Sequence, residues 1–500
     1  MPHSSPFCVV TLLGSKDINW VTNKKPNSFT NPPQFAFSPY LNFLILPRLA
    51  FITGRIALIF QNPLFFTTFF RNFASNMAEL PQEFAESTRQ LMGREGFERY
   101  LKAFDEEAPV SIRLNPKKTK VSTIRTMVST NRPMVSTNRP EGLTVVDGER
   151  VPWCQDGYYL KQRPAFTMDP LLHAGCYYVQ EAASMFLDEV LRQQLSSGFR
   201  PLTALDLCAA PGGKSTLMRA VLPEECSLVS NEPIRQRASI LEENVRKWGG
   251  RNHTVTSQYA KDFRASKSCF DVILADVPCS GEGMFRKDPA TIQEWSPQHV
   301  ERCWQLQRSI VSDIWPCLRP GGLFIYSTCT FNTKENEENI RWILEEYDAE
   351  VMPVSVKPEW NITGSLLDGF TNPVYRFIPG ISRGEGLFMC VLRKAGASSD
   401  ESPTSLRGKS HFAPGKVADP RDAVCGQAAL SYQQAIAYLR GEALVLPPDT
   451  PRGIVEVTFM GHPLGLAKNI GTRANNLYPK PWRIKTTHIP NEYEAILRHT

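Results

Sequence analysis

The sequence predicts an α/β protein with a Rossmann-like parallel sheet, flanking helices, and a smaller domain before and after the sheet. Short apolar runs that end in small, polar or acidic residues alternate with helical stretches between residues 165 and 395, which is the pattern of a parallel sheet covered by helices. A polar, small-residue stretch at 395–410 separates this region from a strand-rich tail. The 500 residues are enough for about two to four domains.

The region before the sheet divides at Met77. Residues 77–104 predict one or two helices, and residues 108–116 alternate like a strand. Residues 1–76 are rich in phenylalanine and nearly free of acids, so we interpret them as an extension that is disordered or that precedes the true initiator, Met77. A targeting segment and a membrane anchor are the alternatives. The apolar run at 41–60 is interrupted by a proline and two arginines, which makes it a poor membrane span.

The heptad MVSTNRP occurs twice in succession, at 127–140. Solenoid repeats are about 20 residues or longer, so we interpret the heptad as a duplication in a surface loop, with a functional arm as the alternative. The predicted organisation is an extension (1–76), an N-terminal domain with the duplicated heptad (77–165), a central α/β domain (166–395), a linker (396–424) and a C-terminal domain (425–500).

Charge and cysteine usage narrow the class of protein. The formal net charge is +6, and residues 1–76 contribute +5 of it from six basic residues and one aspartate. A basic field over the whole protein is therefore excluded, and only local patches can attract an acidic partner. The twelve cysteines include no C-x-x-C pair and no zinc-like spacing. Free thiols in a reducing, cytoplasmic compartment, without a metal, are expected.

The stretch LDLCAAPGGKS, at 205–215, is a near match to a phosphate-binding P-loop. Cys208 stands where that pattern requires its first glycine, and Pro211 removes one of the N–H groups that would cradle a phosphate. A strand, a glycine-containing turn and a helix still make a cofactor loop of Rossmann type. The sequence therefore predicts a cofactor that presents no phosphate to this loop.

Two acidic residues after the next strands indicate what the cofactor contains. Glu232 ends the second strand, where a carboxylate can accept both hydroxyls of a ribose. Asp262 follows the third strand region and could cap an adenine edge. S-adenosylmethionine has a ribose and an adenine but no phosphate, and its methionine moiety would occupy the loop. Taken alone, this pattern is moderately specific.

Two cysteines follow adjacent strands of the predicted sheet. Cys279 stands with Asp276 in DVPCSGEGMFRKDP (276–289), and Cys329 stands in STCTF (327–331). Most single cysteines are buried and inert, which is our interpretation of the others. Two at strand ends beside a cofactor loop predict a shared cleft, where Lys214 is available to favour a thiolate.

A thiolate has a defined use beside a methyl donor. Carbon 5 of a pyrimidine is a poor nucleophile, but a thiolate that adds to carbon 6 makes carbon 5 enamine-like and able to take a sulfonium methyl. The base must first leave its stack. Asp276 could then stabilise the protonated adduct at N3 and N4 of a cytosine, before a base removes the carbon-5 proton and the thiolate leaves. Thiol chemistry alone does not choose between the two cysteines.

The three motifs DLCAAPGGKS, DVPCSGEGMFRKDP and STCTF, in this order, resemble the Sun-type RNA cytosine-C5 methyltransferases over about 165–395. SIRLNP (111–116) and DPLLHAGCYYVQEAASM (169–185) are similar to the N-terminal part of that family. The tail from 460 to 484 resembles the PUA-like RNA-binding domain of the ribosomal small-subunit methyltransferase F group. The resemblance implies a class I methyltransferase sheet between a small α+β RNA-binding domain and a β-rich PUA-like domain.

The resemblance also implies residue roles. Cys329 would be the nucleophile and Cys279 would assist product release, with Asp276 and Lys214 as further catalytic residues. The residues implied in binding S-adenosylmethionine are Cys208, Ala209, Ala210, Pro211, Gly212, Gly213, Lys214, Glu232, Arg237, Asp262 and Asp276. A basic stretch with interleaved aromatic residues would bind RNA through Lys468, Arg473, Lys480, Trp482 and Arg483.

The implied substrate is RNA, first of all small-subunit ribosomal RNA. Transfer RNA is an alternative, and a non-catalytic RNA-binding ribosome-assembly factor is another. The intact Cys279 and Cys329 argue against the latter, because a scaffold need not keep them. DNA is not expected, since by family resemblance the DNA enzymes use the P-C cysteine and lack a T-C motif. Neither a metal nor a stable membrane association is expected. The extension and the duplicated heptad depart from the family pattern.

Overall fold

A computed structural model describes residues 80–119, 142–195, 202–267, 269–396, 424–486, 489–490 and 492–499. They belong to one compact unit that begins at Leu80. The expectations for the extension 1–76, for Met77 and for the duplicated heptad at 127–140 fall outside these residues. Across the described ranges, none of the helices combines the length and the apolar character needed to cross a membrane.

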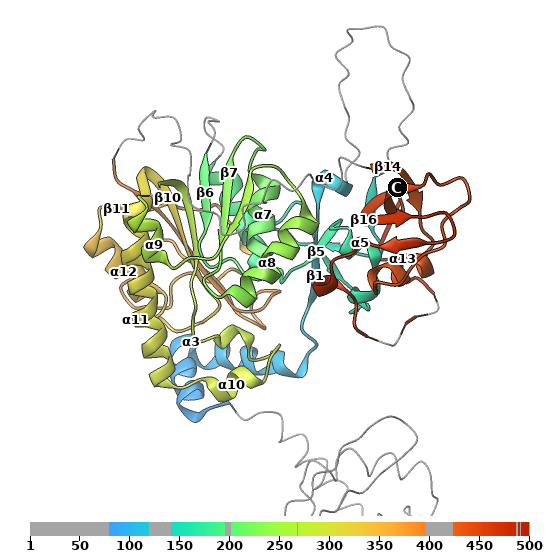
Figure 1. Cartoon of the computed structure of the whole chain (residues 1–500). Coiled ribbons are helices and arrows are strands. Elements are labelled where there is room, and N and C mark those ends of the chain that lie inside the picture. Colours follow the sequence, from blue (N-terminus) through green and yellow to red (C-terminus); the bar gives the residue numbers. More distant parts are fainter. Residues whose placement is uncertain are drawn as a thin grey trace, which may run out of the picture. The chain divides into compact units, whose positions relative to one another are not determined.

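The central sheet has eight strands, in the order β11-β13-β10-β9-β6-β7-β8, with β12 paired to β13 (Figure 1). The strands from β10 to β8 run parallel, so the predicted α/β fold is confirmed. β13 runs antiparallel to β10, so the sheet is mixed, which the sequence pattern did not predict. The strands are β6 (Thr203–Asp206), β7 (Ser227–Asn231), β8 (His253–Thr256), β9 (Phe270–Asp276), β10 (Leu318–Thr328), β11 (Ala349–Val351), β12 (Tyr375–Phe377) and β13 (Leu387–Lys394).

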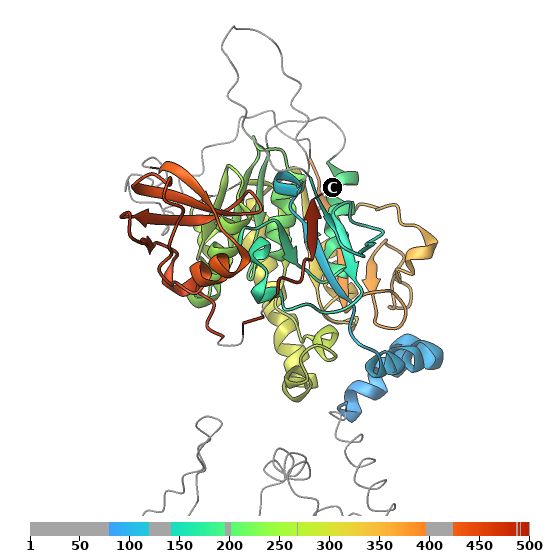
Figure 2. The ribbon, with the colours of Figure 1, turned by 90° about the vertical axis from the view of Figure 1, so that its right-hand side faces the viewer.

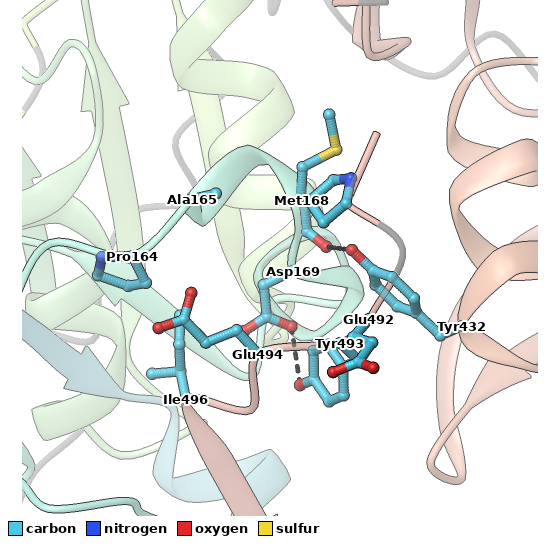
Figure 3. A pocket seen from close by; sticks show the side chains of 10 residues that line it. Pro164, Ala165, Met168, Asp169, Tyr432, Glu492, Tyr493, Glu494 and Ile496 are labelled. Carbon is cyan, nitrogen blue, oxygen red and sulfur yellow. Dashed lines mark hydrogen bonds between the residues drawn. The ribbon is translucent and has the colours of Figure 1, made fainter. Parts of the chain in front are cut away.

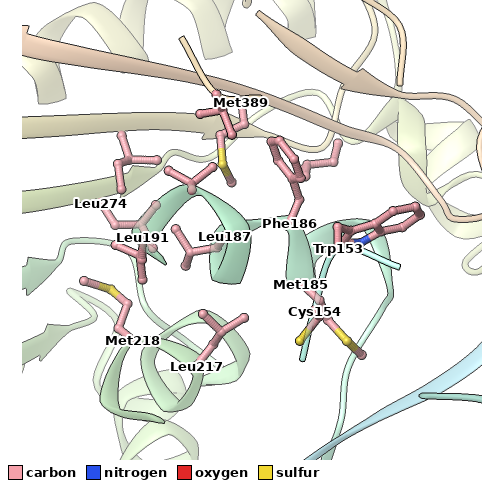
Figure 4. Close-up of a cluster of buried hydrophobic side chains, with 14 of the residues drawn as sticks. Trp153, Cys154, Met185, Phe186, Leu187, Leu191, Leu217, Met218, Leu274 and Met389 are labelled. Atoms are coloured by element: carbon pink, nitrogen blue, oxygen red, sulfur yellow. The ribbon is translucent and has the colours of Figure 1, made fainter. Parts of the chain in front are cut away.

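Both faces of this sheet are buried. Successive side chains of a strand point to opposite faces, and in β9 Leu274 joins the core cluster of Figure 4, whereas Ile273 joins the cluster on the other face. This is why the strands read as continuous apolar runs. The helices of the domain are α6 (Leu187–Gln194), α7 (Gly213–Val221), α8 (Arg235–Trp248), α9 (Ala260–Ala265), α10 (Ala290–Glu294), α11 (Pro297–Ile314) and α12 (Glu337–Glu346).

The N-terminal part contributes a bent helix and a small antiparallel sheet. Helix α3 (Gln82–Lys102) bends at Gly93, whose φ of 71° lies in the left-handed region. Phe84 and Tyr100 of α3 pack on Phe285 and Phe331, which follow the two predicted catalytic cysteines in the chain. The sheet has the order β3-β4-β1-β5. Its elements and the neighbouring short helices are β1 (Val110–Leu114), α4 (Pro116–Thr119), β3 (Glu149–Arg150), β4 (Gly157–Leu160), α5 (Pro170–His173) and β5 (Tyr177–Val179).

The C-terminal part is rich in strands and is joined to the N-terminal part. Its sheet has the order β14-β15-β16-β17. Strand β18 (Leu497–His499) lies outside this sheet and pairs with β2 (Leu143–Val145), beside which it lies in Figure 2. The other elements are β14 (Val424–Ala429), α13 (Tyr432–Leu439), β15 (Gly453–Phe459), β16 (His462–Asn469) and β17 (Ala474–Asn476).

Two tyrosines hold this joint. The Tyr432 hydroxyl donates to the Met168 carbonyl at 3.1 Å, and the Tyr493 hydroxyl donates to Asp169 Oδ1, also at 3.1 Å (Figure 3). Burial raises the pKa of Asp169 to about 6. The pocket beside these bonds is also lined by Glu492 and Glu494, so its acidic lining is unsuited to a phosphate.

Candidate active site

The predicted cofactor loop connects β6 to α7. Gly212 caps α7 with a φ of 117°, a conformation that favours glycine. The loop is tied to its surroundings through its backbone: the Ala209 N–H donates to the Asn231 carbonyl at 2.8 Å, and the Pro211 carbonyl accepts from Asn244 Nδ2, also at 2.8 Å. A fixed loop of this kind holds its shape without a phosphate.

A pocket of about 180 Å³ lies against this loop. It brings together the predicted residues Cys208–Pro211, Gly213, Lys214 and Asp276. The other residues that line the pocket were not predicted as part of the site: Asp206 at the end of β6, and Tyr178, Val179, Gln180, Glu181 and Ser184. The last five lie in the run DPLLHAGCYYVQEAASM, and their separation in the chain from the loop gave no sign that they meet it.

Two buried polar atoms of the pocket have no hydrogen-bond partner among the described residues. The Ser215 hydroxyl donates to Asp206 Oδ2 at 2.6 Å, which leaves Oδ1 unpaired. Gln180 Oε1 accepts from Arg113 Nε at 2.8 Å, which leaves Nε2 unpaired. Burial raises the pKa of Asp206 to about 7. One free acceptor and one free donor in a single pocket fit the ammonium and carboxylate groups of an amino acid.

The predicted ribose and adenine residues follow the neighbouring strands and do not line this pocket. Glu232 is buried, and its Oε1 accepts from the Ile234 N–H at 3.0 Å. Its Oε2 lies 3.2 Å from Arg237 Nη1, in an ion pair without hydrogen-bond geometry. Asp262 Oδ2 accepts from the Tyr259 N–H at 2.9 Å and so caps α9. Glu232 therefore keeps one buried oxygen for a ligand.

The ammonium group of Lys214, predicted to favour a thiolate, also binds a carboxylate. Its Nζ donates to Asp276 Oδ2 at 2.8 Å. Burial by itself would lower the pKa of Lys214, but the nearby carboxylates of Asp276 and Asp206 outweigh burial and raise it. Lys214 therefore stays charged, and its charge is shared between a carboxylate and the cysteine cleft.

The two cysteines predicted to share a cleft are in contact. Cys279 Sγ lies 3.2 Å from Cys329 Sγ and accepts from the Cys329 N–H at 3.3 Å. The hydrogen bond with Cys329, followed by burial, raises the pKa of Cys279 well above its ordinary value. Burial likewise raises the pKa of Cys208. The raised pKa favours Cys279 as a neutral thiol, and at 3.2 Å its hydrogen is within reach of the sulfur of Cys329.

The predicted RNA-binding residues separate into two groups. Lys468, Arg473 and Lys480 are exposed. Trp482 is half-buried, with its ring 6.1 Å from that of Tyr478, and Lys247 of α8 lies 5.7 Å above it. Arg483 is also half-buried. Tyr478, which the sequence places among the basic residues, is buried in the core. The exposed cations are therefore free to meet phosphates, whereas the aromatic residues also hold the domain together.

Among the described residues, no group of three or more histidine, cysteine, aspartate or glutamate side chains is arranged to hold a metal ion. The groups that the site presents are its two thiols, Asp276, Lys214 and the unpaired donor and acceptor of the pocket. Two thiols in contact after β9 and β10, with Asp276 at the end of β9 lining the cofactor pocket, fit a methyltransferase that activates a pyrimidine through cysteine.

Comparison with known proteins identifies the family. The ribosomal RNA small subunit methyltransferase F of Cronobacter sakazakii is 30% identical over 408 residues, which cover 66% of this chain and 83% of that protein. The chain belongs to the ribosomal RNA small subunit methyltransferase F family. The protein of the same name from Shigella flexneri serotype 5b is 28% identical over 489 residues, which cover 81% of this chain and 97% of that protein.

Family profiles match three successive segments. Residues 201–393 match the 16S rRNA methyltransferase RsmB/F family, residues 80–182 match the N-terminal domain of 16S rRNA methyltransferase RsmF, and residues 427–484 match the RsmF PUA domain. A methyltransferase homologue from Pyrococcus horikoshii shares the fold, with a TM-score of 0.50 and 24% identity over 67% of this chain and 99% of that one. The chain is an S-adenosylmethionine-dependent RNA cytosine-C5 methyltransferase with a PUA domain, which confirms the resemblance seen in the motifs.

Proposed function

We propose that the enzyme methylates carbon 5 of a cytosine in 16S ribosomal RNA through a covalent adduct with Cys329. The contact of 3.2 Å between Cys329 Sγ and Cys279 Sγ is the observation that carries the proposal. A neutral Cys279 thiol can stabilise a thiolate on Cys329 by donating to it. The names of the relatives support ribosomal RNA of the small subunit as the substrate.

The steps assign each residue one role. The Cys329 thiolate adds to carbon 6 of a flipped cytosine and forms an S–C bond, so that carbon 5 can accept the methyl group. Asp276 would face N3 and N4, with Lys214 holding one of its oxygens at 2.8 Å. After a base removes the carbon-5 proton, the S–C bond breaks and its electron pair returns to Cys329. Cys279 assists this release.

S-adenosylmethionine supplies the methyl group, and the buried atoms without partners fit it. Asp206 Oδ1 and Gln180 Nε2 would bind the amino-acid head, and Glu232 Oε2 would accept from the ribose hydroxyls. Asp262 would lie toward the adenine. Ile234, two residues after Glu232, and Tyr259, three residues before Asp262, are 54% and 63% exposed and would offer apolar surface to the adenine ring.

Bisulfite sequencing of total RNA from a deletion strain tests the substrate. The expected result is the loss of methylation at a cytosine of 16S ribosomal RNA, with methylation restored by the wild-type gene and not by a C329A gene. Loss at a transfer RNA cytosine would replace the proposed substrate with the alternative one. An unchanged methylation pattern would contradict the proposed reaction and favour an assembly factor.

A further inference from the structure

Two buried glutamates connect the segments that carry the cysteines. We define the P-C loop as residues 278–283 and the T-C loop as residues 329–335. Glu282 lies in the first loop and is 3% exposed, and Glu335 lies in the second and is fully buried. Neither touches the pocket at the cofactor loop. Their charges are expensive to bury, so their presence calls for a physical reason.

The carboxylate of Glu282 binds the T-C loop. Its Oε2 accepts the backbone N–H groups of Phe331 at 2.7 Å and Asn332 at 3.0 Å. Its Oε1 accepts from Trp295 Nε1 at 3.0 Å and from Asn332 Nδ2, also at 3.0 Å. Both oxygens are therefore satisfied, and two of the four bonds fix the backbone that follows Cys329.

The carboxylate of Glu335 reciprocates by binding the P-C loop. Its Oε2 accepts the backbone N–H of Ser280, the residue after Cys279, at 3.0 Å, and Gln307 Nε2 at 2.7 Å. Its Oε1 accepts from Asn332 Nδ2 at 2.8 Å. Each cysteine loop thus supplies a carboxylate that holds the backbone of the other loop. Burial, together with the charge of Glu282, raises the pKa of Glu335 to about 7, so the carboxylate form that accepts all three bonds predominates above that pH.

We propose that Glu282 and Glu335 are positioning residues that form a reciprocal clamp and set the distance between Cys279 and Cys329. The clamp rests on the proposed roles of the two cysteines for its importance, but its geometry is independent of the RNA. Two further bonds join the loops at the cysteines themselves: the Gly283 N–H donates to the Cys329 carbonyl at 2.8 Å, and the Cys329 N–H donates to Cys279 Sγ at 3.3 Å. The carboxylates add bonds to the backbone that follows each cysteine, so that neither loop can shift against the other.

An isosteric substitution distinguishes the effect of the hydrogen bonds of the clamp from the effect of side-chain volume. A carboxylate only accepts hydrogen bonds, and every partner of Glu282 and Glu335 given above donates. In Glu282→Gln, an NH2 group must face either two backbone N–H groups or the Trp295 indole N–H, and none of these can become an acceptor. The volume of the side chain is unchanged, but at least one connection between the loops is lost.

Glu337 provides a matched control. It is fully buried like Glu335 and lies two residues further on, but its Oε1 and Oε2 accept from Arg376 at 2.9 and 2.7 Å, outside both cysteine loops. Glu337→Gln breaks a buried ion pair and should lower the melting temperature at least as much as Glu282→Gln does. It leaves both loops with their own bonds.

The test measures thiol proximity, cofactor binding and turnover in the full-length E282Q, E335Q and E337Q proteins. Phenylarsine oxide condenses with two adjacent thiols, forming two As–S bonds and releasing water, so its capture rate reports the sulfur–sulfur distance without RNA. Cys279→Ala supplies the background rate that does not involve the pair. Calorimetry measures the affinity for S-adenosylmethionine, and methylation of 16S ribosomal RNA gives kcat and KM.

For E282Q and E335Q we expect capture about tenfold slower or more, and kcat lower by about 100-fold, because a displacement of about 1 Å has such an effect on a reacting group. Cofactor affinity should stay within about twofold, and E337Q should keep the wild-type capture rate and kcat despite its lower stability. Wild-type capture rates in both E282Q and E335Q, or an equal loss in E337Q, would overturn the clamp. Because capture needs no RNA, an error in the proposed substrate cannot produce either result.

Discussion

The two halves of the active site differ in how their buried polar atoms are satisfied. On the cofactor side, Asp206 Oδ1, Gln180 Nε2 and Glu232 Oε2 are buried without a hydrogen-bond partner among the described residues. On the cysteine side, both oxygens of Glu282 and of Glu335 accept hydrogen bonds. An unpaired buried polar atom lowers the free energy of unfolding, whereas a satisfied network makes a structure rigid.

Because of this difference, we expect substitutions in the two halves to change different measured quantities. The cofactor half contains buried polar atoms that still lack a hydrogen bond, which a ligand can supply, so substitutions there should change affinity. The cysteine half is organised before any ligand arrives, so substitutions there should change turnover. The following experiments, in order of decreasing effect, test that division.

The largest effect is expected at the cysteines. Cys329→Ala cannot form the covalent bond to carbon 6 and should lose methylation by at least about 10⁴-fold. Cys279→Ala should still attack and transfer the methyl group, but it should release the product poorly. It is expected to accumulate a protein–RNA complex that survives denaturing gel electrophoresis in the presence of substrate RNA and cofactor.

Both alanine variants should keep wild-type affinity for S-adenosylmethionine, which serves as their control. A stable adduct in Cys329→Ala, or none in Cys279→Ala, would reverse or remove the assigned roles. Full activity in both variants would mean that the thiols are inert.

The next effect is expected at Glu232. Glu232→Ala removes the buried oxygen assigned to the ribose and should weaken cofactor binding by ~1–3 kcal/mol, which is about 5- to 150-fold. Isothermal titration calorimetry measures this change. Glu242→Ala, which removes a carboxylate paired with Arg246 on α8, is the control and should bind normally. Equal affinity in Glu232→Ala and the wild type would place the ribose elsewhere.

A smaller, pH-dependent effect is expected at Asp206. Its pKa of about 7 means that the free protein holds this proton at lower pH, and a bound ammonium group must displace it. Cofactor affinity should therefore fall about fivefold between pH 7 and pH 6 because of this group. In Asp206→Asn this dependence should disappear and affinity at pH 8 should be lower. Calorimetry from pH 6 to pH 8 checks both results, and a Gln180→Ala protein that keeps the dependence is the control.

The same group links stability to pH. The folded protein binds the Asp206 proton more tightly than the unfolded chain does, because burial raises the pKa from 3.8 to about 7. Its contribution to the free energy of unfolding is therefore complete below about pH 4 and is lost as the pH rises through about 7. A thermal denaturation series should show this decrease in the wild type and a smaller one in Asp206→Asn. An identical decrease in both proteins would assign it to another group.

The smallest effect is expected at the exposed cations of the C-terminal part. Charge reversal at Lys468, Arg473 and Lys480 should weaken RNA binding and reduce the slope of log K against log salt by about 1 for each lost phosphate contact. Reversal at the exposed Lys102, Lys261 and Lys357 is the control. Deletion of 425–500 is a poorer test, because it also removes the strand that pairs with β2. If both triple variants bind RNA as the wild type does, the basic stretch is only a solvated surface.

The sequence was informative wherever function follows from position in a parallel sheet. Carboxyl ends of parallel strands meet at one edge, so the cofactor loop, Asp276, Cys279 and Cys329 could be placed together from the order of the strands alone. The antiparallel direction of β13 could not be predicted, because its run LFMCVLRK places apolar side chains on both faces of the sheet. Such a run is expected of a buried strand whether it is parallel or antiparallel to its neighbours.

The predictions stopped where a contact joins distant parts of the chain. Gln180 and Arg113 reach the cofactor loop from a separate small sheet, and periodicity does not reveal which loop a side chain will meet. Glu282 stands inside the motif DVPCSGEGMFRKDP and Glu335 follows STCTF closely, and their charge beside buried strand ends was a usable signal. Each glutamate binds the backbone of the other loop, and this arrangement forms only when both loops have folded, so neither stretch of sequence predicts it alone.

The pairing of β18 with β2 has a consequence for biosynthesis. Residues 497–499 must leave the ribosome before Leu143–Val145 can complete its ladder, so β2 waits with an open edge while the central domain is already being made. An open edge can recruit a strand from another chain. A product that ends before Leu497 would keep that edge unpaired.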